Sequence, residues 1–479
     1  MRMALVCGDG LPVSGLLTVF RNVVDRADAA GSLSTPIPAD LGYSWRPDKP
    51  AFYPRGAAST VSPPWLDVTD ATPLGDDAGV AEELTAIRVA VAAPEQLSTA
   101  ERARLRERID VLAGPYERHF LDWWERHDVD WVCAVNMTLS DAVPVTLALH
   151  RAAERRWGAG RPGGVLFWDH DLFASYAVHE GSSRVYPRAP NEFTPVPNDP
   201  RLHRWAVVSP ALVEEGAGYP TGLQPELVPN VLPVVPAGRS TRHREFLAQH
   251  GLTDGRPVVL CPVRMFRVKG VEVAVRLLAA VRNVCVGRDE PVPYLLVFGS
   301  LGEDPEYTEE VMAAVAAEGV GDDVRFLDGV PLTSGRGPDG RWLLDEADLL
   351  RVCADSHGGV FFTPNRPDVE SVGLGPALAA LVDVPCASTT YDARDEVYGS
   401  DFVQVRVDPQ APAASAAEFA DYLAAARRAD PAVQSMLAGN RILMRERFPD
   451  GPWRNLLAQM ARAVSAGRQA PSATATTTP

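Results

Sequence analysis

Residues 257–285 carry the pattern that decides the fold: PVVLCPVRMFRVKGVEVAVRLLAAVRNVC. The opening run is apolar and β-branched, which favours a buried strand, and residues 271–285 repeat apolar side chains at helical spacing. A second apolar run at 293–298 precedes another helical pattern at 305–318. This order of strand, loop, helix and strand predicts a βαβ unit with parallel strands.

The same alternation extends in both directions along the chain. The sequence therefore predicts an α/β protein of two doubly wound, Rossmann-like domains that face each other across a cleft. We expect residues 1–232 to form the first domain, 233–440 the second, 441–468 a helix that packs back toward the first, and 469–479 a disordered tail. Residues 31–79 are rich in Pro, Gly and Ser and predict a binding loop rather than core elements. Further strands are expected at 3–7, 131–135, 164–168, 205–208, 324–327, 359–363 and 385–387, and further helices at 16–24, 100–126, 343–354 and 375–382.

Composition restricts the partners that the chain can have. Its 479 residues carry a net charge of −16, which disfavours binding to nucleic acid. No apolar run is long enough to span a bilayer, and the N-terminus lacks a signal-peptide pattern, so we expect a cytoplasmic protein without a membrane partner. The six cysteines are scattered singly through apolar segments, which predicts reduced, buried thiols and no metal site.

Cations gather in the loop that follows the strand at 257–262. Arg264, Arg267 and Lys269 lie between that strand and the next helix, and Lys269 is one of only two lysines in the chain. Cations beside a helix N-terminus favour a diphosphate site, in which Lys acts as a point charge and Arg as a fork. The alternative is a solvated basic loop.

Three other strand ends carry polar groups. Glu370 precedes a glycine-rich helix start and is suited to sugar hydroxyls, or is simply an acid favoured by that helix terminus. His170 stands between Asp169 and Asp171, either as a site or as a structural His beside a capping Asp. The first turn, 8–15, is a phosphate or sugar loop or an ordinary tight turn.

Taken together, these segments resemble a GT-B glycosyltransferase and are similar to family 4 of the retaining enzymes that use nucleoside-diphosphate sugars. The resemblance covers residues 1 to about 462 and depends on markers that occur in the family's order. They are the first turn with Gly15, His170-Asp171, Val208-Ser209-Pro210, Val228-Pro229-Asn230-Val231, Arg264 with Lys269-Gly270, and Glu370-Ser371-Val372-Gly373-Leu374.

The resemblance implies a role for each marker. Arg264 and Lys269 would neutralise the diphosphate, Glu370 would hold the sugar, and His170 would lie near its hydroxyls. The donor would also contact Gly15, Ser371, Val372, Gly373 and Leu374, the last two through backbone N–H groups. Cleavage of the bond to phosphate builds negative charge on the leaving group, which fixed cations stabilise, so no metal is expected.

The implied activity is hexosyl transfer, with retention, from a UDP or GDP sugar to a small soluble acceptor. No other cofactor is implied. The arginine-rich, alanine-rich composition is typical of actinobacteria and favours specialised-metabolite (antibiotic) biosynthesis. A homodimer is left open, as is the base of the donor. For the acceptor we expect contacts with Asn136, Asp169, Trp45, Arg46, Tyr53 and Arg55. The last four suggest a molecule that is flat, anionic or both.

One position departs from the family pattern. The family usually has a second Glu eight residues after the first, to receive the nucleotide ribose, but here that position is Leu378. Asp368 or a backbone carbonyl would then hold the ribose, or the nucleotide would bind more weakly. The remaining alternatives are a catalytically silent GT-B protein that binds a nucleotide sugar or a partner, a pseudo-glycosyltransferase that couples cyclitols, and a sugar-nucleotide epimerase.

Overall fold

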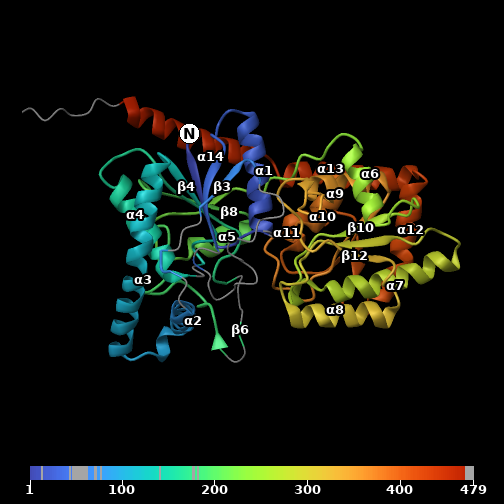
Figure 1. The fold of residues 1–479 in the computed structure, drawn as a ribbon, viewed down its shortest axis with the longest axis horizontal. Coiled ribbons are helices and arrows are strands. Elements are labelled where there is room, and N and C mark those ends of the chain that lie inside the picture. The colour runs from blue at the N-terminus through green and yellow to red at the C-terminus, as the bar shows by residue number, and fades with distance from the viewer. Residues whose placement is uncertain are drawn as a thin grey trace, which may run out of the picture.

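The computed structural model describes residues 1–11, 14–42, 45, 63–69, 73–75, 78–139, 142–174, 179–180 and 183–469. Two parallel sheets lie side by side, each covered by helices (Figure 1). Within the described residues, no helix combines the length and the apolar character needed to cross a membrane.

The first sheet has seven parallel strands in the order β3-β2-β1-β4-β5-β8-β9. Every residue of β1, β4 and β5 is buried, as expected for central strands covered on both faces. From β1 the chain adds strands first toward one edge of the sheet, through β2 and β3, and then toward the other edge, beginning with β4. Ligands bind at such a switch point, here between β1 and β4. The elements are β1 (Met3–Cys7), α1 (Gly15–Ala29), β2 (Ile37–Leu41), β3 (Leu66–Val68), α2 (Ala78–Ala92), α3 (Thr99–Arg126), β4 (Trp131–Val135), α4 (Val143–Trp157), β5 (Gly164–Asp169), β8 (His203–Val207), α5 (Pro210–Ala217) and β9 (Glu226–Leu227).

The second sheet has six parallel strands in the order β12-β11-β10-β15-β16-β17, with its own switch point between β10 and β15. Two short antiparallel ribbons, β6 with β7 and β13 with β14, lie outside the two sheets. The elements are β6 (His179–Glu180), β7 (Ser183–Arg184), α6 (Thr241–Gln249), β10 (Val258–Cys261), α7 (Val271–Gly287), β11 (Tyr294–Val297), α8 (Pro305–Glu318), β12 (Val324–Phe326), β13 (Gly335–Arg336), β14 (Trp342–Leu343), α9 (Glu346–Asp355), β15 (Gly359–Phe362), α10 (Gly375–Leu381), β16 (Cys386–Thr389), α11 (Arg394–Tyr398), β17 (Val405–Val407), α12 (Ala416–Arg427), α13 (Pro431–Arg447) and α14 (Gly451–Gln469).

The last helix, α14, lies over the first sheet (Figure 1). The Trp453 ring meets the Trp168 ring of β5 edge-on, with centroids 4.7 Å apart. Near its end Arg468 donates to Asp130 at 2.7 Å. The predicted helical stretch 441–468 is interrupted, because α13 ends at Arg447 and α14 begins at Gly451.

The segment 31–79, predicted to contain no core element, holds β2 and β3. The sequence concealed β2 because Pro38 and Asp40 are unusual inside a central strand. Asp40 is fully buried, and its carboxylate lies 2.7 Å from Nε2 of His119 on α3. A polar residue in this strand therefore has a buried partner 79 residues further along the chain.

All six cysteine thiols are buried and none forms a disulfide, as predicted. Burial raises the pKa of Cys261 to about 12, so this thiol is protonated at neutral pH. The tail predicted to be disordered lies outside the described residues from 470 onward.

Candidate functional site

Lys269 lies in a single 3-10 turn, Arg267–Lys269, between β10 and α7. Gly270 ends that turn with φ 61°, and a Cβ added to it would come within 2.0 Å of the Thr363 carbonyl oxygen. Only glycine fits this position, which lets the loop pack closely against the end of β15. The Lys269 ammonium donates to Oε1 of Glu370 at 2.6 Å, so the structure brings together two of the predicted residues.

Arg264 comes directly after β10 and is held by an acid that the sequence analysis missed. Its Nε donates to Oε1 of Glu303 at 2.6 Å, while Oε2 of Glu303 accepts the Met265 N–H at 2.6 Å. Glu303 follows β11 and its side chain is 5% exposed. The position of Glu303 after β11, the parallel neighbour of β10, was the signal in the sequence that could have predicted this contact. From the first domain, the Asp9 carboxylate lies 3.6 Å from the Arg264 guanidinium.

Beyond Glu370, the 371–374 segment is fixed through its backbone. The hydroxyls of Tyr391 and Tyr398 donate to the Gly373 carbonyl at 3.2 and 2.5 Å. Gly373 has φ 68°, and an added Cβ would lie 2.6 Å from the Tyr391 hydroxyl. The Val372 side chain is buried in the core, so a donor contact here would come from the backbone.

His170 follows β5 in the first domain and is buried. Its Nε2 lies 2.8 Å from Oδ1 of Asn230, and its ring meets Trp168 edge-on with centroids 4.4 Å apart. Burial lowers the His170 pKa to about 4, against the opposing effect of the Asn230 hydrogen bond. The imidazole is therefore neutral at pH 7, and with Nε2 donating to Asn230 its Nδ1 is the unprotonated nitrogen.

Asp171 joins the two domains. Its Oδ1 accepts from the Ser371 hydroxyl at 2.5 Å, and its Oδ2 accepts from Nδ2 of Asn136 at 3.2 Å. The Asn136 Oδ1 in turn accepts the backbone N–H groups of His170 at 2.6 Å and Asp171 at 3.3 Å. Asn136, which was predicted to contact the acceptor, thus orients this loop.

Asp169 has a structural role instead of the predicted contact with an acceptor. It is fully buried, and its carboxylate accepts from the Thr138 N–H at 3.2 Å and from the Trp205 indole at 2.9 Å. Burial raises its pKa to about 7, although the hydrogen bonds oppose that shift. A strand-end carboxylate can point to either side of the backbone, and this one points into the core.

The predicted aromatic acceptor loop is only partly described. Trp45 is 1% exposed and belongs to the core of the first domain, so its ring is not offered to a ligand. Arg46, Tyr53 and Arg55 lie outside the described residues. Gly15 is the first residue of α1, beside the capping Ser14, and a Cβ added to it would meet nothing within 4 Å.

Leu378, at the position of the missing second Glu, is a core residue. It lies in α10 and packs in the apolar cluster around β10, β11 and β15. It is 3% exposed. The alternative ribose ligand suggested by the sequence, Asp368, is exposed and accepts two hydrogen bonds from Arg366, at 2.9 and 2.5 Å.

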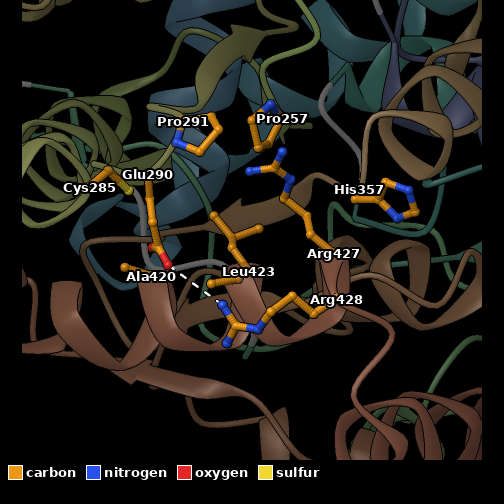
Figure 2. Close-up of a pocket in the computed structure, with 10 residues that line it drawn as sticks. Pro257, Cys285, Glu290, Pro291, His357, Ala420, Leu423, Arg427 and Arg428 are labelled. Atoms are coloured by element: carbon orange, nitrogen blue, oxygen red, sulfur yellow. Dashed lines mark ion pairs between the residues drawn. The ribbon is translucent and has the colours of Figure 1, made fainter. Parts of the chain in front are cut away.

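A separate cavity of about 360 Å³ lies in the second domain (Figure 2). It is lined by Pro257, which precedes β10, whereas Lys269 follows β10. The cavity is therefore at the amino end of that strand, opposite the predicted residues. Arg428 in its wall is paired with Glu290 at 3.7 Å. This hollow and the interdomain site are different places.

Several solved structures share this architecture across almost the whole chain. A glycosyltransferase from Rickettsia africae aligns with a TM-score of 0.57 and 13% identity, covering 97% of this chain and 98% of that one. The chain has the GT-B fold. Sucrose-phosphate synthase from Thermosynechococcus elongatus has a TM-score of 0.55, 14% identity and coverage of 97% and 100%. HepE from Anabaena, solved with UDP and glucose, has a TM-score of 0.53, 12% identity and coverage of 97% and 100%.

These similarities confirm the predicted fold class of two parallel-sheet domains. No protein-family model and no curated protein sequence matches the chain. Membership of family 4 therefore stays a prediction.

Proposed function

We propose that this protein is a retaining, metal-independent glycosyltransferase that moves a hexosyl group from a nucleoside diphosphate, UDP or GDP, to a small acceptor. The observation that carries the proposal is the contact between two sets of strand-end loops. Asp171 of the first domain accepts from Ser371 of the second at 2.5 Å, and Glu370, the residue before Ser371, accepts from Lys269 at 2.6 Å.

The leaving diphosphate gains negative charge as its bond to the sugar breaks. Arg264 and Lys269 lie in the loop after β10 and would stabilise that charge, because fixed cations in a partly buried site need no reorganisation during the reaction. The backbone of Gly373 and Leu374 would add N–H donors. Glu370 would accept from sugar hydroxyls and orient the ring. The neutral His170 would contribute an uncharged hydrogen-bonding group.

The acceptor would approach from the first domain and attack the anomeric carbon while the sugar is held against the second. HepE has been solved with UDP-glucose, which supports a nucleotide-sugar donor for a chain of the same fold. An acceptor in antibiotic biosynthesis stays part of the proposal on the basis of composition alone.

A thermal-shift screen against UDP, GDP and their hexose conjugates tests the donor. A ligand present at about 100 times its Kd should stabilise the fold by about 2.7 kcal/mol. Release of the nucleoside diphosphate from the stabilising conjugate, followed with candidate acceptors, then tests transfer. The proposal fails if no nucleotide or conjugate shifts the transition.

A second candidate, a silent GT-B protein that binds a nucleotide sugar or another protein, is favoured by one observation. Leu378 is buried where the resembling family has its ribose-binding Glu. This candidate predicts nucleotide binding without release of diphosphate under any acceptor condition, so the second stage of the same experiment separates it from the first.

A further inference from the structure

Asp171 is the acid that the first domain places against the proposed sugar site. Asn136 holds it from two sides, accepting its backbone N–H at 3.3 Å and donating to its Oδ2 at 3.2 Å. Asn136 itself has φ 54°, a left-handed conformation that Asn adopts more readily than most residues. The carboxylate is therefore fixed by its own domain before any ligand binds.

The other carboxylate oxygen reaches across to the second domain. Oδ1 accepts from Ser371, the residue next to Glu370, and Glu370 accepts from Lys269. A chain of contacts thus runs from Asn136 through Asp171, Ser371 and Glu370 to Lys269. The Ser371 hydroxyl donates to Asp171 in the same way that a hydroxyl of a bound sugar would.

In this chain of contacts, carboxylates outnumber cations. Two carboxylates, Asp171 and Glu370, share one ammonium, Lys269, among the described residues of this chain of contacts. Burial raises the pKa of Asp171, with Ser371 and Lys269 opposing that shift and Glu370 adding to it. Burial of this carboxylate costs stability, which the two donors that face it, the Ser371 hydroxyl and the Asn136 amide, offset in part. Of these two donors, Asn136 belongs to the same domain as Asp171 and Ser371 to the other, so Ser371 is the donor that a ligand hydroxyl can replace.

We propose that Asp171 is a specificity-determining residue. When a donor binds, a hydroxyl of its sugar replaces Ser371 as the hydrogen-bond donor to Asp171. The site thereby selects neutral hexosyl donors over uronosyl donors. The inference rests on the proposed function. Two carboxylates accept hydrogen bonds from several sugar hydroxyls at once, but they repel a third carboxylate carried by the ligand.

Calorimetry with the full-length chain and the Asp171→Asn variant tests this inference. The probes are the nucleoside diphosphate alone, its neutral conjugate and its uronosyl conjugate: UDP, UDP-glucose and UDP-glucuronate, or GDP, GDP-mannose and GDP-mannuronate. We expect Asp171→Asn to weaken binding of the neutral conjugate by about tenfold to a hundredfold, because the variant loses a charged hydrogen bond to the sugar. Binding of the free nucleotide should stay within about twofold, and the preference for the neutral conjugate over the uronosyl one should shrink.

Two results would overturn the inference. Equal losses of affinity for the free nucleotide and its conjugate would show a general structural effect. No loss of affinity for either would show that Asp171 does not contact the sugar. Ser371→Ala gives an independent reading should Asp171→Asn not fold. Without the competing hydroxyl, the neutral conjugate should bind tighter relative to the free nucleotide, and an unchanged ratio would count against the inference. Wild-type protein that binds none of the probes would refute the proposed function itself.

Discussion

The two domains contribute opposite charges to the place where they meet. The first domain presents carboxylates, Asp9 and Asp171, from the ends of β1 and β5, whereas the second presents Arg264 and Lys269 from the end of β10. Each cation is already paired with an acid of its own domain, Glu303 or Glu370. These acids hold both cations in place, where the proposed function requires them for a diphosphate, and the first domain adds carboxylates that can accept hydrogen bonds from hydroxyls.

The sharpest test of this division is Lys269→Ala. We expect turnover to fall by roughly 10²- to 10³-fold, as when a single preorganised group facing transition-state charge is removed. Initial rates of nucleoside-diphosphate release measure the effect. Arg267→Ala is the matched control, because Arg267 lies in the same turn but is exposed and paired with Glu310. Similar losses in both variants would show that the turn, and not the Lys269 charge, matters.

A second test concerns Leu378 in the second domain. Leu378→Glu would restore the acid of the resembling family, but it would place a charge in an apolar cluster where Leu378 is 3% exposed. We expect the free energy of unfolding to fall by about 3–5 kcal/mol. Denaturant unfolding measures it, with the volume-conserving Leu378→Met as control at less than about 1.5 kcal/mol. A stable Leu378→Glu protein with tighter nucleotide binding would contradict the structure of this region.

The Arg264 guanidinium allows the two domains to be compared directly. Glu303→Gln removes the charged acceptor of Nε and should weaken nucleoside-diphosphate binding by about threefold to tenfold, because Arg264 is no longer held in place. Asp9→Asn removes a carboxylate that lies 3.6 Å away, where the phosphate would compete with it, and should tighten binding by about twofold to threefold. Calorimetry with the same nucleotide measures both. Effects of the same sign would contradict the division between the domains.

A separate test, of stability and not of binding, is the titration of Asp169, whose pKa is raised to about 7 from 3.8. Between these values the folded state binds the extra proton, so this group makes the wild-type protein less stable as pH rises. Relative to the wild type, Asp169→Asn should therefore gain stability between pH 5 and pH 8, measured as the difference in Tm. Asp199→Asn is the control, because the Asp199 pKa is about 2 and its carboxylate does not titrate there. A constant difference for Asp169→Asn would contradict the assignment.

The second domain was the easier half to predict. Its central strands are continuous apolar runs, and one of only two lysines in an arginine-rich chain marked the loop after β10. In the first domain, β2 was missed because its buried Asp40 is explained only by His119, which lies far along the chain. The directions of Asp169 and Trp45 also depend on packing, and so both were assigned to an acceptor although they lie in the core.

The candidate site could also be predicted only where the position of a residue at a strand end decides where it lies. Arg264, Lys269 and Glu370 could be proposed because parallel strands bring their carboxyl ends to one edge. Glu303 and the bond from Ser371 to Asp171 depend on exact loop conformations, which no spacing in the sequence specifies.

The packing of Trp453 on Trp168 has a consequence for biosynthesis. The apolar face of α14, with Leu456, Leu457 and Met460, completes the core of the half of the chain that leaves the ribosome first. At roughly 5–20 residues per second, translation makes about 240 further residues before this helix is finished, a delay of roughly 12 to 48 seconds. During that interval the nascent first domain lacks the apolar cover that α14 gives it in the folded protein.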